Sequence, residues 1–372
     1  MIKLYISISL VLLILLSGCV GSNPDNGVKI GITLPLTGAM ASYGEEIKKG
    51  LDLAVEEINA NPENKSKIEL IYEDACYPKD ATTAISKLVE IDEIDFVGGN
   101  FCVIAMPPIS AVTEPKKISV MQISTASDMI LTSGEYVFSP NIASAYSAKA
   151  QAKFAKDYWD ANTVGIIHYN TDMGKSYGKN FAKEFENLGG KVLVLEETAL
   201  EQYDFKDVLT KILEKNPDVL QLVHMGPNLG SMLNQLKSMG INKPIITYEE
   251  AENPDLFKTA KENAIGMVIA IPGMTESEYM FEFEKKFKDK YNENPAVLAR
   301  VAYDAIHLEY AAYKNCGDNK DCIHDYLLNV KDYVGASGIY SILSDGTAGK
   351  EIVFKQVVDE LGTLETIDYV PK

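Results

Sequence analysis

Apolar, strand-like runs alternate with helix-like periods from Val28 to Ile271, and this alternation is the feature that most constrains the fold. Helical stretches such as Gly174–Leu188 and Leu229–Met239 separate the runs. Repeated βα alternation favours parallel sheets with helices on both faces. We predict strands, enough for two sheets, at Val28–Leu34, Ile68–Tyr72, Ile94–Val97, Ile118–Ile123, Val164–His168, Val192–Leu195, Val219–Val223, Ile245–Tyr248 and Met267–Ile271.

The pattern changes after Ile271. Two helical stretches, Glu276–Lys290 and Ala296–Lys314, precede a single β-like run at Ile352–Val358. This tail is too small to form a domain, so we expect it to rejoin the earlier lobes and make the domains discontinuous. The chain length also exceeds what one hydrophobic core supports, which predicts two lobes.

In open α/β sheets, ligands bind beyond the carboxyl ends of the strands. A binding site is therefore expected in the loops that follow the predicted strands, which are residues 35–44, 98–104, 124–128, 169–175, 224–228, 249–253 and 272–276.

The N-terminus is typical of an exported lipoprotein. Lys3 precedes an uncharged run, Leu4–Leu16, which has the length of a signal-peptide core and is too short to span a bilayer. The run ends in Leu16-Ser17-Gly18-Cys19, which resembles a lipobox, so residues 1–18 are expected to be a signal peptide. Residues 19–27 then form a tether lipidated at Cys19, on the outer face of the cytoplasmic membrane. A cleaved secretory signal with a chance cysteine is the alternative.

Composition excludes some partners. The formal net charge is -18, which disfavours nucleic acid, because neutralising phosphates needs clustered Lys and Arg. Arg300 is the only arginine, so a bidentate arginine clamp on an anion has one possible source.

The chain has five cysteines, and lipidation of Cys19 leaves four. An even remainder in an exported protein suggests disulfides, with three possible connectivities. Cys316 and Cys322 flank a short polar loop and pair most economically, which leaves Cys76 and Cys102 as partners. A metal site is the rival interpretation, and the chain lacks the CxxC spacing and nearby histidine pairs that would favour it.

No GxSxG, HExxH, P-loop, GxGxxG or CxxC pattern occurs, so we expect no enzyme, no cofactor and no metal. His168 and His224 end predicted strands, where backbone-satisfied positions are more common than catalytic ones. Glu249 directly follows the strand Ile245–Tyr248, and a carboxylate there can bind an ammonium group through a charge-assisted hydrogen bond.

Four segments carry a family resemblance. They are Gly31–Gly38 with Tyr43-Gly44, Tyr72–Ala81, Asp95–Gly99 before Cys102, and Tyr303-Asp304-Ala305. In this order they resemble the branched-chain (Leu/Ile/Val) amino-acid-binding proteins, type I periplasmic solute receptors of ABC importers, over residues 28–360.

The resemblance implies an α/β fold of the type I periplasmic binding proteins. It has two Rossmann-like lobes with parallel sheets, joined by a three-strand hinge, and a Cys76–Cys102 disulfide. We place lobe 1 at residues 28–141 plus 270–343, and lobe 2 at residues 142–269 plus 344–372.

The resemblance also implies ligand contacts. Tyr43 matches an aromatic residue of the first loop, and Glu249 matches the acidic residue that receives the ligand ammonium. Ser124–Ser127 matches the segment that holds the ligand carboxylate, with backbone groups from Ala126 and a hydroxyl from Ser127. The sequence departs from the family pattern at Val103, where a hydroxyl residue is common, and at Met173, which stands in place of a tyrosine.

The expected function is capture of a small solute, an amino acid of the branched-chain type or a related one, for an ABC importer permease. A small polar or amide ligand is an alternative because of the two departures. A ligand sensor that signals to a membrane receptor is another, and an enzyme is disfavoured by the missing nucleophile motif.

Overall fold

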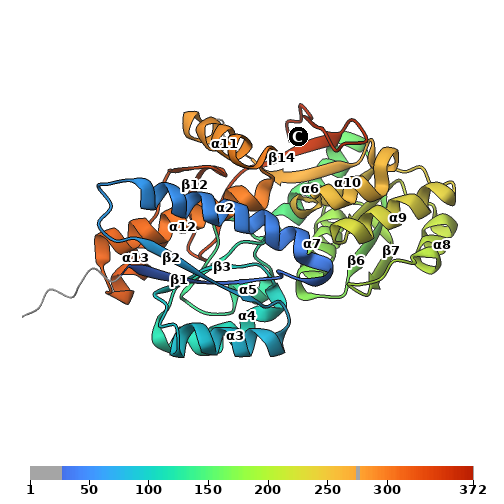
Figure 1. Ribbon diagram of the computed structural model, residues 1–372. Helices are drawn as coiled ribbons and strands as arrows, with labels where there is room; N and C mark the ends of the chain where they lie inside the picture. The colour runs from blue at the N-terminus through green and yellow to red at the C-terminus, as the bar shows by residue number, and fades with distance from the viewer. Residues whose placement is uncertain (1–26, 274–276, 372) are drawn as a thin grey trace, which may run out of the picture.

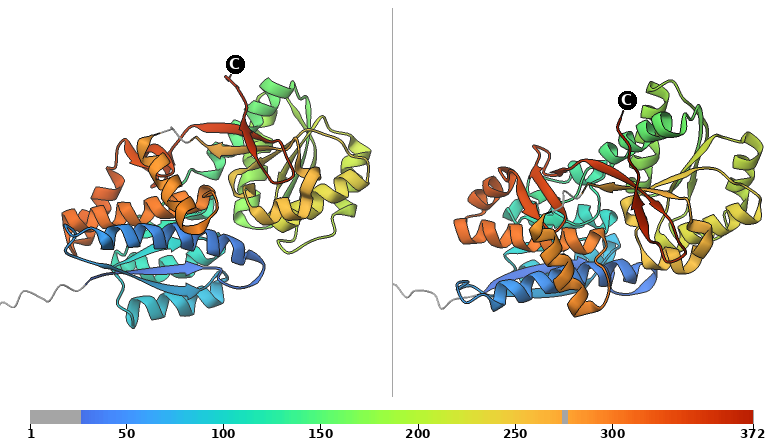
Figure 2. Two further views of the ribbon diagram at one scale, coloured as in Figure 1. Left: turned by 45° about the horizontal axis from the view of Figure 1, so that its top comes forward. Right: turned by 90° about the horizontal axis from the view of Figure 1, so that it is seen from above.

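The computed structural model describes residues 27–273 and 277–371, and it contains two sheets side by side, each covered by helices (Figures 1 and 2). Lobe 1 is built on a five-stranded sheet and lobe 2 on a seven-stranded sheet. The two lobes come from discontinuous parts of the chain, since the blue N-terminal and orange late segments share one lobe in Figure 1. This arrangement confirms the predicted α/β fold.

The sheet of lobe 1 has the order β2-β1-β3-β4-β5, and all its neighbours are parallel. Its strands are β1 (Val28–Leu34), β2 (Ile68–Asp74), β3 (Phe96–Asn100), β4 (Val120–Gln122) and β5 (Val137–Phe138). Helix α2 (Ala41–Ala60) packs against α12 (Val297–Cys316) over one face. The other helices of this lobe are α3 (Pro78–Glu90), α4 (Met106–Thr113), α5 (Asp128–Leu131), α11 (Glu278–Tyr291) and α13 (Lys320–Leu328).

The sheet of lobe 2 has the order β15-β14-β10-β9-β8-β6-β7. Its parallel strands are β6 (Thr163–Tyr169), β7 (Lys191–Thr198), β8 (Val219–Val223), β9 (Ile245–Tyr248) and β10 (Val268–Pro272). The covering helices are α6 (Ser144–Trp159), α7 (Asp172–Asn187), α8 (Lys206–Lys215), α9 (Gly226–Ser238) and α10 (Pro254–Ala260). Strand β10 lies wholly in this sheet and includes residue 270, so the predicted lobe boundary between residues 269 and 270 falls inside a strand of lobe 2.

The last part of the chain differs from a purely parallel design. Strands β14 (Ile352–Val357) and β15 (Leu364–Thr366) add to lobe 2 in the antiparallel direction. They do so because the chain returns to this sheet from lobe 1, without the covering helix that a parallel connection needs. A small antiparallel sheet of β11 (Tyr333–Gly335), β12 (Gly338–Ile342) and β13 (Ala348–Gly349) precedes them.

All nine strands predicted before residue 272 are present, with ends shifted by at most three residues. The central strands are the most buried, as in β8 and β10, where every residue is buried, whereas the edge strands β2 and β7 are partly exposed. Burial on both sheet faces explains why the central strands are rich in apolar residues and do not alternate. The short strand β5 was missed, because two residues carry no periodicity.

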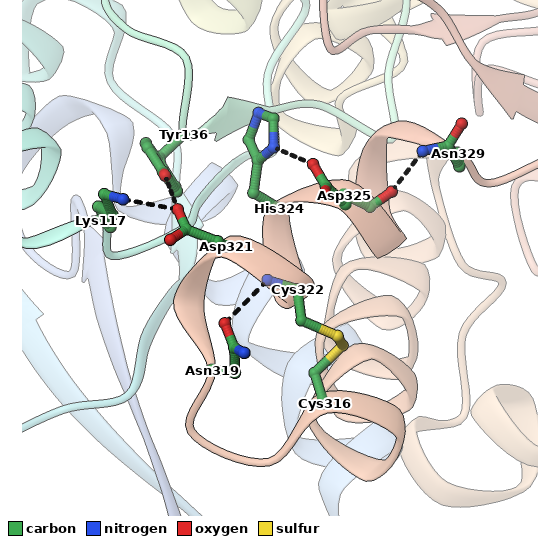
Figure 3. A network of polar contacts seen from close by, with 9 residues as sticks. All are labelled: Lys117, Tyr136, Cys316, Asn319, Asp321, Cys322, His324, Asp325 and Asn329. Atoms are coloured by element: carbon green, nitrogen blue, oxygen red, sulfur yellow. Dashed lines mark hydrogen bonds and ion pairs between the residues drawn. A yellow bond between two sulfur atoms is a disulfide. The ribbon is translucent and has the colours of Figure 1, made fainter.

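The Cys316–Cys322 disulfide joins the end of α12 to the start of α13, as the spacing indicated (Figure 3). Next to it, Asp321 accepts hydrogen bonds from Lys117 Nζ at 2.7 Å and from the Tyr136 hydroxyl at 2.9 Å. These contacts attach α13 to the loops that flank β4 and β5.

Glu309 on α12 is a fully buried carboxyl group in lobe 1, and neither of its oxygens accepts a hydrogen bond from a described residue. Burial raises the pKa of Glu309 well above 4.5, and the charge of Lys320 only opposes this. The folded protein therefore holds this proton more tightly than the unfolded chain does. Its contribution to stability is present below pH 4.5 and is lost as the pH rises toward the folded pKa.

Replacing Glu309 with methionine is expected to raise the free energy of unfolding at pH 7 by about 1–3 kcal/mol, because an unpaired buried polar group is removed. Urea denaturation at pH 5 and pH 7 measures this, and the gain should be larger at pH 7. Glu45→Met is the control on exposed surface of α2. A Glu309→Met protein less stable than the wild type at pH 7 would contradict the interpretation.

Candidate functional site

A pocket lies between the lobes, at the carboxyl ends of both parallel sheets. All but two of its lining residues, Cys76 and Leu200, come from loops that the sequence marked as binding loops. The lining consists of Met40, Cys76, Phe101, Cys102, Val103, Ile104, Ser124, Tyr169, Thr171, Met173, Leu200, Met225 and Glu250. The strand-end rule therefore located the pocket correctly.

The lobe 1 wall of the pocket is mostly apolar and is cross-linked by a disulfide. Cys76 and Cys102 form a disulfide that ties the β2–α3 loop to the segment after β3. Cys102 precedes η2 (Val103–Ala105), a short helix that runs directly into α4. Phe101 stacks on the Tyr43 ring with 5.4 Å between ring centroids. Such a wall suits the apolar part of a small solute.

Glu250 is the one acidic side chain that lines the pocket, and it is 2 % exposed. It lies in the short helix η4 (Glu249–Ala251) after β9. Its Oε1 accepts a long hydrogen bond, 3.4 Å, from the Thr125 backbone N–H of lobe 1. Burial raises the pKa of Glu250 well above its ordinary value, and the neighbouring Glu249 carboxylate adds to the rise.

Glu249 itself is fully buried and does not line the pocket. Its two carboxylate oxygens accept from the Tyr177 hydroxyl on α7, at 3.1 and 2.9 Å. Burial raises the pKa of Glu249 to about 7, although the hydrogen bond from Tyr177 lowers it in part. The structure thus places the adjacent Glu250, not Glu249, on the pocket surface.

The other predicted contacts divide into two groups. Ser124 and Met173 line the pocket. Ala126 and Ser127 are fully buried beside it, outside the lining. The Ala126 backbone is engaged elsewhere, because its N–H donates to the Ile142 carbonyl and its carbonyl accepts from the Ser144 N–H. The Ser127 hydroxyl has no hydrogen-bond partner among the described residues.

Tyr43 acts across the lobe interface and lies behind Phe101. Its hydroxyl accepts from the Gly226 N–H at 2.7 Å and donates to the Glu250 carbonyl at 3.4 Å. Gly226 has no room for a side chain, since a Cβ there would lie 3.1 Å from this hydroxyl and 2.8 Å from Asn253 Oδ1. Tyr43 therefore belongs to the closed contact between the lobes.

Two further contacts join the lobes around the pocket. The Tyr77 hydroxyl donates to Glu201 at 3.0 Å, and the Met129 N–H donates to Asp172 at 3.0 Å. With the Tyr43 contacts, they hold the lobes in a closed arrangement.

The sequence reasoning did not single out Phe101, Tyr169, Met225 or Glu250. All four lie in loops that it marked, so their position was available as a signal. The sequence carries no signal for which of Glu249 and Glu250 faces the pocket. Consecutive residues of a 3-10 helix point about 120° apart, so only one of the two can do so. Which of the two faces the cavity depends on how η4 is seated between the lobes.

The sequence matches the periplasmic binding protein family over residues 27–360. The chain belongs to this family. Within the part of the chain that the structure describes, no helix has the length and apolar character needed to cross a membrane. Nor do His, Cys, Asp and Glu side chains gather there in a group of three or more suited to a metal ion.

Relatives of this periplasmic binding protein have different ligands in their names. The leucine-, isoleucine-, valine-, threonine- and alanine-binding protein of Pseudomonas aeruginosa is 25% identical over 298 residues, covering 78% of this chain and 79% of that protein. The leucine-binding protein LivK of Thermotoga maritima superposes with a TM-score of 0.86 at 22% identity, covering 91% and 97% of the two chains. A solute-binding protein of Rhodopseudomonas palustris in complex with 3,4-dihydroxybenzoic acid has a TM-score of 0.83 at 21% identity, covering 92% and 96%.

Proposed function

We propose that this protein captures an amino acid, of the branched-chain type or a related one, between its two lobes and delivers it to an ABC importer. The observation that carries the proposal is Glu250, a buried carboxyl group in a pocket whose lining contains no Lys, Arg or His. Such a carboxylate favours an ammonium group, because an uncompensated charge is costly in an apolar site.

The rest of the pocket fits the other parts of an amino acid. The apolar wall of Phe101, Val103, Ile104 and Met225 accommodates an aliphatic side chain. The Ser124 hydroxyl and the first N–H groups of the η2–α4 helical run are suited to the carboxylate, since helix N-termini favour anions. This assignment gives Val103 a backbone role in place of the hydroxyl that the family pattern led us to expect.

Delivery follows from lobe closure. In our proposal the ligand stabilises the closed arrangement, and the permease recognises that form. Lipidation of Cys19, which lies outside the described residues, would hold the receptor on the outer face of the cytoplasmic membrane. We also propose the division given by the sequence, residues 28–141 plus 270–343 and 142–269 plus 344–372, with the limit at 269/270 moved beyond β10, which pairs within the lobe 2 sheet. In this proposal Ala126 and Ser127 support the pocket from behind.

Calorimetric titration tests the ligand class. Leucine, isoleucine, valine, threonine and leucinamide are titrated into the mature chain, next to benzoate and 3,4-dihydroxybenzoate. We expect binding of at least one amino acid or amino amide and none of the benzoates, because a benzoate would place a second anion against Glu250. Binding of benzoates without any amine would overturn the amino-acid assignment.

Replacing Tyr43 with phenylalanine is expected to weaken leucine binding about 5- to 150-fold. The change leaves the buried Gly226 N–H unpaired in the closed form, which costs about 1–3 kcal/mol. Titration calorimetry of the variant measures the loss. Tyr146→Phe, at a half-exposed site on α6, should bind like the wild type. Equal affinity of Tyr43→Phe and the wild type would remove this tyrosine from the closure mechanism.

A further inference from the structure

Two consecutive carboxyl groups, Glu249 and Glu250, are buried at the centre of the lobe interface, with exposed fractions of 0 and 2 %. Each has little to stabilise a charge. Among the described residues, Glu249 accepts hydrogen bonds from other residues only through the Tyr177 hydroxyl, and Glu250 accepts only the long bond from the Thr125 N–H. Two negative charges on neighbouring buried residues repel each other, so a proton or an external cation must balance at least one of them.

The groups that surround Glu250 supply no cation. Tyr43 and Glu46 approach it from α2, and Glu249 adjoins it on η4. The remaining groups that interact with it are phenols, which come from β6, α7 and β9 and are Tyr169, Tyr177 and Tyr248. All of these side chains are neutral or negative.

The positive charges of Arg300 and Lys355 act on Glu252 and not on Glu250. Burial raises the pKa of Glu252, and the charges of Arg300 and Lys355 oppose this rise. Burial also raises the pKa of Glu46 to about 8, and the charge of Glu252 adds to it. The whole interface around Glu250 is therefore short of positive charge when no ligand is bound.

We propose that ligand capture exchanges a proton for an ammonium group at Glu250. The inference rests on the proposed function, since it requires a ligand that carries an ammonium group. In the empty pocket, Glu250 holds its proton. On binding, the O–H bond of Glu250 breaks, the proton leaves to solvent, and the freed carboxylate oxygen accepts an N–H of the ligand ammonium.

The mouth of the pocket provides an exit for that proton. A second cavity adjoins the pocket and shares Met40, Cys76, Leu200 and Met225 with it. This outer cavity is lined by Asp74, Asp80 and Glu201, and no basic side chain lines it. It connects Glu250 with carboxylates at the surface.

The exchange makes affinity depend on pH in a defined direction. Below the pKa of Glu250 in the free protein, each unit of pH raises the association constant by up to about tenfold, because one proton is released for each ligand bound. A rise in acidity on the outer face of the membrane would thus favour ligand release.

Titration of leucine into the mature chain, in phosphate and in imidazole at pH 6, 7 and 8, tests the exchange. The two buffers differ in ionisation enthalpy, so the difference between the measured heats gives the number of protons released. We expect about one proton per leucine at pH 7, and an association constant that increases with pH. Glu249→Gln should reduce the release, because it removes the charge that raises the pKa of Glu250. Glu214→Gln on the exposed surface of α8, outside both cavities, should leave it unchanged.

The outcomes separate this inference from the proposed function. Leucine binding with equal heats in both buffers at all three pH values overturns the proton exchange and leaves the amino-acid receptor intact. Failure of leucine and of every other amine to bind overturns both. Full proton release in a Glu250→Gln variant that still binds leucine would move the exchange to another carboxyl group.

Discussion

Replacing Glu250 with glutamine is expected to lower the affinity for leucine at least about 30-fold. Glutamine keeps the size of the side chain but cannot balance a buried ammonium group. Loss of one partner of a buried, hydrogen-bonded charge pair costs about 2–5 kcal/mol, and about 1.4 kcal/mol corresponds to a factor of ten. Titration calorimetry at pH 7.5 gives the two association constants directly.

Two comparisons make this prediction specific. Glu214→Gln on the exposed surface of α8 should bind leucine within about twofold of the wild type, because exposed charges far from the pocket contribute little. Glu249→Gln should lose less affinity than Glu250→Gln, because Glu249 faces Tyr177 and not the pocket. A larger loss for Glu249→Gln would assign the ammonium to the residue that the sequence alone indicated.

Replacing Asp304 with alanine is expected to lower the free energy of unfolding by about 3–5 kcal/mol. The Asp304 carboxylate on α12 is fully buried and accepts from the Ala336 N–H at 2.6 Å and the Ser337 N–H at 3.0 Å. It also accepts from the Tyr340 hydroxyl at 3.3 Å. Lys350 lies next to this network, where its Nζ donates to Ser337 Oγ at 2.7 Å. Alanine leaves the buried Ala336 and Ser337 N–H groups and the Tyr340 hydroxyl without this acceptor, and it removes the negative charge that interacts with Lys350.

Urea denaturation followed by circular dichroism measures this loss. The control is Asp325→Ala on α13, whose ion pair with His324 has an exposed carboxylate and should contribute less than about 1 kcal/mol. If both variants unfold at the same urea concentration, the Asp304 network does not hold the small sheet to α12. Asp304→Asn is expected to fall between the two, since the amide oxygen still accepts hydrogen bonds.

Strong local signals determined most of the elements. The strands between Val28 and Pro272 are rich in apolar residues, most completely in β10, and they were recognisable because burial on both sheet faces favours apolar residues along a strand. The small sheet β11-β12-β13 and the edge strand β15 were missed. Strands β11, β13 and β15 are two or three residues long and partly exposed, so their sequences carry neither a period nor an apolar run. Strand β12 alternates in burial over five residues, but only two of them, Ile339 and Ile342, are aliphatic.

The cysteine pairing was also within reach of the sequence. Cys316 and Cys322 were assigned from their spacing, and Cys76 and Cys102 by remaining as the other pair; both disulfides are present. The sequence did not show that the Cys76–Cys102 disulfide lies in the pocket wall. This position follows from the sheet order, in which β2 and β3 are the two neighbours of β1 and the loops after them meet above its end.

By itself, the sequence determined the α/β class, the two lobes and the loops that line the pocket between them, because these depend on local periodicity and on the rule for parallel strand ends. The tertiary structure decided which side chains of those loops face the cavity. The carboxylates of Glu249 and Glu250 differ by one position and carry the same local signal. Only the seating of η4 between the lobes turns one toward Tyr177 and the other toward the pocket.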